Sequence, residues 1–194
     1  MRRQGQKTVS GPTRKSRLPR RDALQLTHIA QTASYRMGFG SDVHRLVPGR
    51  KLILGGVHID FDRGPLGHSD GDALAHAICD ALLGAAALGD IGGHFPDSSP
   101  RWKNASSLDF LRQVRLLLRE RGFATVNVDS TIELEKPRLA PFIDRMRAKV
   151  ARSLRITVDQ VSVKAKSGEG MGDIGHGEAI RAEAVVLICC SGGL

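Results

Sequence analysis

The sequence predicts an α+β fold, in which helices pack on one face of a mixed β-sheet. Three segments carry apolar residues at helical spacing: 72–88, 106–121 and 141–154. Three others have the alternation, or the apolar and β-branched composition, of strands: 125–134, 160–165 and 179–189. Helices and strands alternate along the chain and two strands close it, which is typical of a sheet covered by helices.

The first half of the predicted body is punctuated by glycine. Residues 36–40 form a short segment of this kind, and residues 51–59 read as a strand broken by a Gly-Gly turn or bulge. The helix that follows is expected to begin with Ser69 or Asp70 as its N-cap and to end before Gly89.

The second half carries equally local signals. Gly122 follows helix 106–121 as a stop, and Pro141 suits the first turn of the last helix. Strand 125–134 alternates between polar and apolar residues, whereas strand 179–189 is mostly apolar and indicates a buried position.

The 194 residues are 41% hydrophobic, enough for one domain, which we place at residues 36–190. The formal net charge of +9 is uneven, because residues 1–36 carry +8 and residues 37–194 carry +1. A nearly neutral body with one Trp and one Tyr argues against a nucleic-acid stacking surface. Residues 1–35 are predicted to be a basic, disordered extension or a targeting leader, and contact of this tail with RNA is a further alternative.

Cysteines and hydropathy bear on the compartment. The three cysteines, Cys79, Cys189 and Cys190, show no paired spacing, which favours a reducing environment. No apolar run approaches the roughly 20 residues that span a membrane, so no membrane association is expected. We predict bacterial cytoplasm, or the plastid stroma if residues 1–35 are a transit peptide.

Three residues are candidate metal ligands. Asp42 and His44 are two apart in an extended segment and so point to the same side. With His76 they form a set that leaves one position of a tetrahedral ion open, as catalytic zinc sites do. Each signal is weak alone. An Asp-x-His turn is usually a polar turn at the protein surface, and a lone His is usually a half-buried residue with its hydrogen bonds satisfied. Asp80, one turn beyond His76, is a candidate for orienting its ring.

Two glycine-rich loops are candidate ligand-binding segments. Residues 88–97 form a tight loop in which Asp90 and Asp97 can accept hydrogen bonds from hydroxyl groups. Residues 163–172 contain Lys166, Ser167 and Glu169, which suit a diphosphate with a bridging Mg²⁺. Either segment is equally compatible with a plain loop.

Taken together these motifs resemble the 2-C-methyl-D-erythritol 2,4-cyclodiphosphate synthase family. The resemblance spans residue 36 to about residue 188. It is carried by FGSDVH (39–44), HSDGDALAHAICDALLGAAALGDIGGHFPDSSP (68–100), VDSTI (128–132) and KPRL (136–139).

The resemblance implies a fold, an assembly and residue roles. The fold is a ferredoxin-like two-layer sandwich with a four-stranded type of sheet, assembling as a homotrimer whose active sites lie between subunits. Asp42, His44 and His76 match the family's ligands for Zn²⁺ or another divalent ion, and Glu169 matches the carboxylate that holds Mg²⁺ or Mn²⁺ with the substrate diphosphate. His68 and Ser167 match the two positions that stabilise the transition state.

The resemblance also implies the substrate contacts. It implies that the chain that holds the cytidine is not the chain that holds the zinc. The implied substrate-binding residues are Asp42, His44, His68, Ser69, Asp90, Ile91, Gly92, Phe95, Pro96, Asp97, Leu134, Pro137, Arg138, Leu139, Ala140, Lys166, Ser167, Gly168 and Glu169. Members often have threonines where this chain has 166–168. Many have an aromatic residue and an arginine, associated with isoprenoid diphosphate binding in the trimer's cavity, where this chain has Asp173 and His176.

The implied activity is that of a metal-dependent, cyclising phosphorus-oxygen lyase in the non-mevalonate pathway to isoprenoid (terpenoid) precursors. It converts 4-diphosphocytidyl-2-C-methyl-D-erythritol 2-phosphate to 2-C-methyl-D-erythritol 2,4-cyclodiphosphate and releases CMP. The partners are then a small cytidine diphosphate substrate and copies of the same chain, with no nucleic acid and no membrane. The alternatives are a zinc-dependent phosphohydrolase of a nucleotide diphosphate, which uses water as nucleophile, and a non-enzymatic module that binds nucleic acid through the leader.

Overall fold

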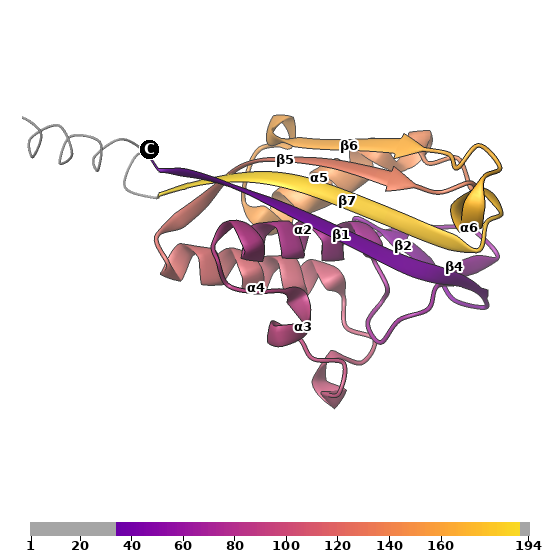
Figure 1. The fold of residues 1–194 in the computed structure, drawn as a ribbon, viewed down its shortest axis with the longest axis horizontal. Helices are drawn as coiled ribbons and strands as arrows, with labels where there is room; N and C mark the ends of the chain where they lie inside the picture. Colours follow the sequence, from indigo (N-terminus) through magenta and orange to yellow (C-terminus); the bar gives the residue numbers. More distant parts are fainter. Residues whose placement is uncertain (1–33, 191–194) are drawn as a thin grey trace, which may run out of the picture. The chain divides into compact units, whose positions relative to one another are not determined.

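A computed structural model describes residues 34–190, and residues 1–33 and 191–194 lie outside that range. The described part is an α+β unit built on a five-stranded mixed sheet, as Figure 1 shows. The α+β class is therefore confirmed, but the sheet has five strands where a four-stranded type was expected. The strands, in spatial order, are β4 (Arg63–Pro65), β1 (Tyr35–Pro48), β7 (Ala179–Cys190), β5 (Phe123–Glu133) and β6 (Val161–Lys166).

The sheet is mixed because only one pair of neighbouring strands is parallel. β1 pairs antiparallel with β7 from Tyr35 opposite Cys189 to Arg45 opposite Ala179. β7 is also antiparallel to β5, whereas β5 and β6 are parallel. The fifth strand, β4, adds three residues antiparallel to the end of β1, and nothing in its short sequence indicates a strand.

β1 is far longer than the short glycine-punctuated segment predicted at residues 36–40. Its glycines are sites of close packing rather than breaks in the strand. A Cβ atom built on Gly38 would lie 1.9 Å from the carbonyl oxygen of Ala81, and one on Gly40 would lie 2.2 Å from that of Ala77. The two glycines therefore allow helix α2 (Ala73–Ala85) to rest directly on the strand backbone.

The predicted broken strand at residues 51–59 is a β-hairpin outside the main sheet. β2 (Leu52–Leu54) and β3 (Val57–Ile59) pair antiparallel as a separate two-stranded sheet. Gly55 and Gly56 form the turn with φ of 53° and 69°, values that glycine adopts without strain.

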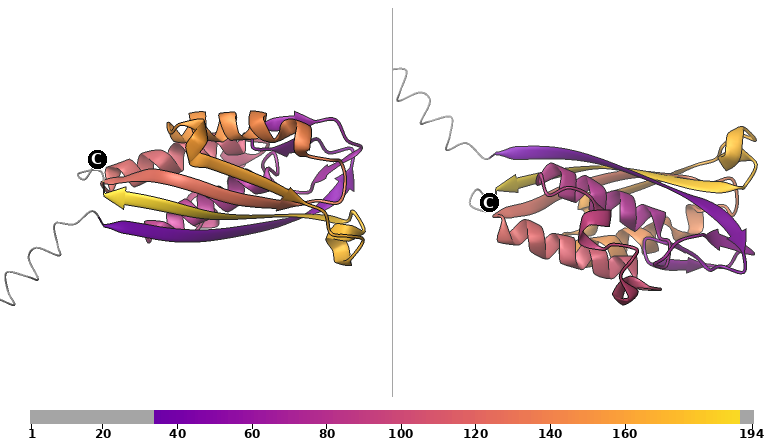
Figure 2. Two further views of the ribbon diagram at one scale, coloured as in Figure 1. Left: turned by 90° about the horizontal axis from the view of Figure 1, so that it is seen from above. Right: turned by 60° about the horizontal axis from the view of Figure 1, so that its bottom comes forward.

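The three predicted helices are present with small shifts at their ends. α2 lies within the predicted 72–88, and the other two are α4 (Ser107–Glu120) and α5 (Ile143–Leu154). Their apolar stripes face the sheet, and the two views in Figure 2 show all three helices on the same side of it. Two four-residue helices were not predicted: α3 (Ile91–His94) and α6 (Gly172–Gly175).

The N-cap of α2 is Asp72 rather than Ser69 or Asp70. The Asp72 carboxylate accepts hydrogen bonds from the backbone N–H of Ala75 at 3.1 Å, of Gly55 at 2.9 Å and of Gly56 at 2.6 Å. It is fully buried, and it fastens the hairpin turn to the start of the helix. Burial raises its pKa to about 6, with a smaller contribution from the neighbouring Asp70 charge. The sequence favoured the earlier residues because capping preferences alone do not show which side chain the hairpin will meet.

On the face of the sheet opposite the helices, a strip of exposed apolar side chains runs along β1 in the described chain. Side chains at alternate positions of β1 point to this face, and Val185 of β7 lies among them. The exposed fractions are 57% for Tyr35, 74% for Met37, 60% for Phe39, 52% for Val43 and 40% for Val185. A run of this kind on one sheet face is typical of a contact surface.

The remaining sequence predictions have mixed outcomes. Cys79, Cys189 and Cys190 are free thiols. Among residues 34–190 no helix has the length and apolar character needed to cross a bilayer. The predicted extension or leader at residues 1–35 falls almost entirely outside the described residues, so its role, the domain bounds 36–190 and the compartment stay predictions.

Candidate metal centre and active-site pocket

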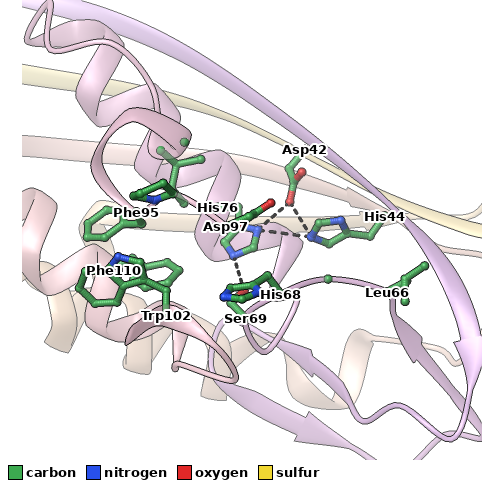
Figure 3. Close-up of a pocket in the computed structure, with 14 residues that line it drawn as sticks. Asp42, His44, Leu66, His68, Ser69, His76, Phe95, Asp97, Trp102 and Phe110 are labelled. Atoms are coloured by element: carbon green, nitrogen blue, oxygen red, sulfur yellow. Dashed lines mark hydrogen bonds and ion pairs between the residues drawn. The ribbon is translucent and has the colours of Figure 1, made fainter. Parts of the chain in front are cut away.

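Asp42, His44 and His76 converge on one point, as Figure 3 shows. Asp42 and His44 lie on the helix-facing side of β1, and His76 stands in the first turn of α2, where Gly40 lets the helix approach. Asp42 Oδ2 is 3.0 Å from His76 Nδ1 and 3.2 Å from His44 Nε2. The two ring nitrogens are 3.4 Å apart.

This triangle has the dimensions of a metal centre. Ligand atoms bound at the usual zinc distances in a tetrahedron lie about 3.3 Å from one another. The three observed separations of 3.0, 3.2 and 3.4 Å bracket that value. Two imidazole nitrogens and one carboxylate oxygen also form a donor set typical of catalytic zinc. The residues present therefore fit a divalent ion, and three protein ligands leave a fourth position for substrate.

The charge states of Asp42 and His44 favour a cation. Burial acts to raise the pKa of Asp42, but its hydrogen bond to His76 and the charges of both histidines outweigh this and hold the pKa below its ordinary value. Burial lowers the pKa of His44 more than the Asp42 charge raises it. For His76, burial acts to lower the pKa, and the hydrogen bond to Asp42 together with nearby carboxylates raises it above the ordinary value. At neutral pH the centre thus holds an ionised carboxylate and a neutral His44.

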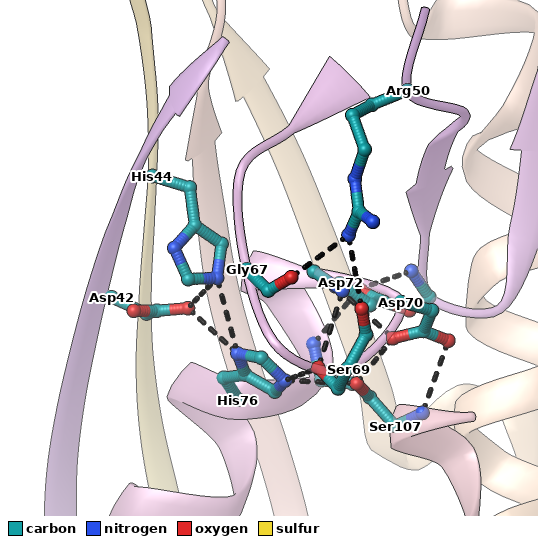
Figure 4. A network of polar contacts seen from close by, with 12 residues as sticks. Asp42, His44, Arg50, Gly67, Ser69, Asp70, Asp72, His76 and Ser107 are labelled. Carbon is teal, nitrogen blue, oxygen red and sulfur yellow. Dashed lines mark hydrogen bonds and ion pairs between the residues drawn. The ribbon is translucent and has the colours of Figure 1, made fainter. Parts of the chain in front are cut away.

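A hydrogen-bond chain orients His76, as drawn in Figure 4. The hydroxyl of Ser107, at the start of α4, donates to Asp70 Oδ1 at 2.5 Å, and the Ser107 backbone N–H donates to the other oxygen at 3.0 Å. Since its proton is used on Asp70, the Ser107 hydroxyl accepts from His76 Nε2–H, at 2.8 Å. Ser69 Oγ lies 3.1 Å from the same nitrogen. Nε2 therefore carries a proton, and Nδ1 is the atom left for the ion.

The sequence assigned the orienting role to Asp80, and that prediction is wrong. The Asp80 carboxylate instead accepts the backbone N–H of Ile91 at 2.7 Å and ties α3 to α2. The i+4 spacing placed Asp80 on the correct face of the helix. It gave no signal for Ser107, which lies 31 residues from His76 along the chain.

One arginine holds the loop that leads into α2. The Arg50 guanidinium donates to the carbonyl oxygens of Pro65 at 3.1 Å, Gly67 at 3.0 Å and Ser69 at 3.0 Å. Figure 4 shows it reaching over the segment that carries Ser69. Sequence reasoning did not single out Arg50, because its three carbonyl acceptors lie 15 to 19 residues further along the chain and no local pattern indicates them.

A pocket of about 520 Å³ opens over the metal centre. It gathers predicted residues from four separate segments of sequence. Asp90 lies beside it as the N-cap of α3, with its side chain accepting from Gly93 N–H at 2.9 Å. The predicted residues that line the pocket are Asp42, His44, His68, Ser69, His76, Ile91, Gly92, Phe95, Pro96 and Asp97.

The end of the pocket away from the ligands is aromatic. Phe95 stacks on Phe110 with ring centroids 4.5 Å apart, and Trp102 meets Phe110 edge-on at 5.5 Å. Figure 3 shows these three rings together, on the side of His76 opposite His44. Trp102 and Phe110 were not predicted, since no local motif marks them and only the fold brings them to Phe95.

Comparison with known proteins agrees with this geometry. Residues 35–189 match the model of the YgbB family. The chain belongs to the YgbB family. The chain is 56% identical over 153 residues to the 2-C-methyl-D-erythritol 2,4-cyclodiphosphate synthase of Moorella thermoacetica, covering 79% of this chain and 94% of the relative.

Solved structures give the same result for the YgbB fold. A 2C-methyl-D-erythritol-2,4-cyclodiphosphate synthase in its CDP-bound form matches with a TM-score of 0.73 and 40% identity, over 79% of this chain and 99% of that one. The bifunctional IspDF of Campylobacter jejuni matches with a TM-score of 0.79 and 38% identity, over 82% of this chain and 43% of that one. This chain thus spans less than half of the bifunctional protein.

Two predicted segments do not join the pocket in a single YgbB chain. Among residues 34–190, neither 134–140 nor 166–169 lines it. Both lie at the ends of strands β5 and β6, where Glu135 accepts the Gly168 backbone N–H at 3.0 Å. Ser167 donates to Glu169 at 2.5 Å, and both side chains are exposed. The predicted roles of these residues, and that of His68 in transition-state stabilisation, stay predictions.

Proposed function

We propose that this chain converts 4-diphosphocytidyl-2-C-methyl-D-erythritol 2-phosphate to 2-C-methyl-D-erythritol 2,4-cyclodiphosphate with release of CMP. The observation that carries the proposal is the Asp42–His44–His76 triangle at the bottom of the pocket, in a chain 55–56% identical to synthases of that name. We assign the activity to the non-mevalonate route to isoprenoid precursors and the ligand to the class of cytidine diphosphates, since a related structure holds CDP.

The reaction brings two phosphate groups of one substrate together, and their like charges oppose this. Zn²⁺ or another divalent ion on Asp42, His44 and His76, with Mg²⁺ or Mn²⁺ on Glu169, would supply the Lewis acidity that offsets this repulsion. The 2-phosphate then attacks the β-phosphorus, and the bond to the CMP oxygen breaks. No protein nucleophile takes part.

The chain's own groups bind and orient the folded substrate. His68 and Ser69 line the pocket next to the metal centre, and Ile91 and Gly92 line another part of it. The aromatic end adds an apolar wall to the pocket, and exclusion of water by such a wall favours attack by the phosphate within the substrate over hydrolysis. Proximity between the two phosphates supplies much of the remaining rate acceleration.

We further propose a homotrimer of ferredoxin-like two-layer sandwiches, in which each active site is shared by two subunits. The open apolar face of β1 and β7 supports an assembly, because five large side chains there are 40% exposed or more. The loops 134–140 and 166–169 support sharing, because they contain predicted substrate residues that lie outside the pocket of their own chain. In the assembly they would complete a neighbour's pocket and hold its cytidine and diphosphate.

Mixing two inactive variants tests the shared site. Asp42→Asn removes a metal ligand from one part of the site, and Glu169→Gln changes the other part. If neighbouring chains supply the two parts, trimers assembled from an equal mixture recover about one quarter of wild-type activity. A site within one chain gives no recovery. Each variant mixed with wild type is the control for exchange of subunits.

Product analysis tests the reaction itself. In H₂¹⁸O, phosphorus NMR and mass spectrometry should find a cyclic diphosphate without solvent oxygen. The zinc-dependent phosphohydrolase considered from the sequence predicts a linear product carrying ¹⁸O, and detection of that product contradicts our proposal. That alternative is not favoured, because the relatives at 55–56% identity are cyclodiphosphate synthases.

A further inference from the structure

A second pocket, of about 620 Å³, lies at the C-terminal ends of α4 and α5 and the start of β5. It shares no lining residue with the metal pocket. Its lining contains three arginines and no acidic residue, which is unusual for a surface where charges of both signs alternate. The three arginines are Arg115, Arg119 and Arg155.

The three guanidinium groups have no counter-charge within the described chain. None of them forms an ion pair with a carboxylate of residues 34–190. The Nε of Arg115 is buried and meets no hydrogen-bond acceptor in the same range. Burial lowers the pKa of Arg115, and the positive charges of Arg155 and Arg119 lower it further. A buried donor without a partner destabilises the fold, so its retention points to an external acceptor.

Capping of the helix ends does not account for these arginines. Positive side chains at a helix C-terminus usually bond to its last carbonyl groups. Arg147 of α5 is an example of an arginine whose donors are occupied. It donates to the carbonyl oxygens of Val158 and Val161 and pairs with Asp144. No comparable bond from the Arg115, Arg119 or Arg155 side chain exists within residues 34–190.

The rest of the pocket lining is mostly apolar, with Thr125, Thr157 and Gln160 as its uncharged polar members. Leu118, Phe123, Leu154 and Ile156 line it beside the arginines. The guanidinium of Arg36 lies over the Phe123 ring, 4.6 Å from its centroid, and adds a fourth positive charge at the edge. The pocket lining therefore combines guanidinium donors with large apolar side chains.

We propose that this pocket binds a small organic phosphate, with the phosphate on the three guanidinium groups and an apolar group against Phe123 and Ile156. A guanidinium group can donate two parallel hydrogen bonds to two oxygens of one phosphate, which makes phosphate a favoured ligand of arginine. A doubly charged phosphate also balances the charge of more than one arginine. The site does not depend on the metal centre or on the proposed reaction.

Phenyl phosphate is the probe, titrated calorimetrically into the metal-free full-length protein so that phosphate binding through the metal centre does not contribute. Inorganic phosphate and phenol, tested separately, measure the anionic and the apolar halves. Arg115→Gln removes the buried donor and should weaken binding of phenyl phosphate about tenfold or more. Arg152→Gln is the matched control, since Arg152 is an exposed arginine of α5 that does not line the pocket, and it should change affinity less than about twofold.

A second variant guards against loss of folding. Arg155 has φ of 57°, a conformation that glycine adopts freely, so Arg155→Gly removes a guanidinium while keeping the backbone. It should weaken binding severalfold and leave the melting temperature without ligand unchanged or raised, because repulsion from Arg115 is relieved. The proposal is wrong if phenyl phosphate does not bind saturably. It is also wrong if Arg155→Gly and Arg152→Gln weaken binding equally, which would indicate diffuse attraction to a basic chain.

Discussion

The metal centre and the loops 134–140 and 166–169 are both predicted parts of one active site, yet they are built differently. Asp42, His44 and His76 come from β1 and α2, which pack backbone against backbone, and His76 is held by a chain of hydrogen bonds. In the second loop Ser167 and Glu169 are exposed, and Glu169 adopts φ of 51°. The first region is complete in one chain, whereas loop 166–169 of the second leaves the Ser167 and Glu169 side chains exposed.

This contrast indicates what each region needs to become functional. The metal centre needs only an ion, because its ligand atoms already have the required spacing. The loops need the pocket of another chain to complete, and the proposed neighbouring subunit supplies that pocket. Substitutions in the metal centre should therefore act on metal binding, and those in the loops on turnover at full metal content.

The largest expected effect is that of His76→Ala. Loss of one of three ligands should abolish stoichiometric zinc and reduce CMP release by at least about 10³-fold. Metal analysis by mass spectrometry and a CMP assay check both quantities. His58→Ala, at an exposed position of β3, is the control and should change neither. Retained turnover in metal-free His76→Ala protein would remove the metal from the mechanism.

A smaller effect concerns pH and the buried cap that fixes the start of α2. The pKa of Asp72 is raised to about 6 in the folded protein. The folded state therefore binds this proton more tightly than the unfolded chain does, and the stability that it contributes below about pH 4 is lost as pH rises through 6. The free energy of unfolding of metal-free protein should fall by about 3 kcal/mol between about pH 3 and about pH 7, measured by urea denaturation.

Asp72→Asn is the comparison for this pH effect. It should be less stable throughout, because an amide cannot accept all three backbone N–H bonds, but its decline between pH 4 and pH 6 should be shallower. Parallel curves for the variant and the wild type would assign the decline to other groups.

The smallest expected effect is that of Ser107→Ala, which removes the acceptor of the His76 Nε2 proton while leaving all three ligands. Metal affinity should fall about 10–100-fold, with full activity recovered at saturating metal. Competition with a chelator of known affinity measures this loss. Ser153→Ala removes another buried hydroxyl, one bonded to the Lys149 carbonyl in α5, and should leave metal affinity unchanged.

The sequence was informative wherever structure follows from local periodicity. The stripe from Leu74 to Leu82 predicted α2, and the two-residue spacing of Asp42 and His44 correctly put both side chains on one face of an extended segment. The motif resemblance placed ten residues that do line one pocket.

Contacts between distant segments were beyond such reasoning. Gly38 and Gly40 suggested a broken strand, because glycine weakens a strand unless another backbone approaches, and only the fold brings Ala77 and Ala81 there. Likewise Asp72 as the cap and Ser107 as the partner of His76 depend on contacts with the hairpin and with α4.

The bare backbone at Gly38 and Gly40 links tolerance to mutation with catalysis. A single methyl group at either position would push the strand and the helix apart, and the separation of Asp42 from His76 would widen with it. Neither evolution nor design can therefore adjust the width of the ion site through these two residues. Glycine to alanine is the smallest possible change, and it already displaces the helix by more than the 3.0 Å separation of Asp42 Oδ2 and His76 Nδ1 tolerates.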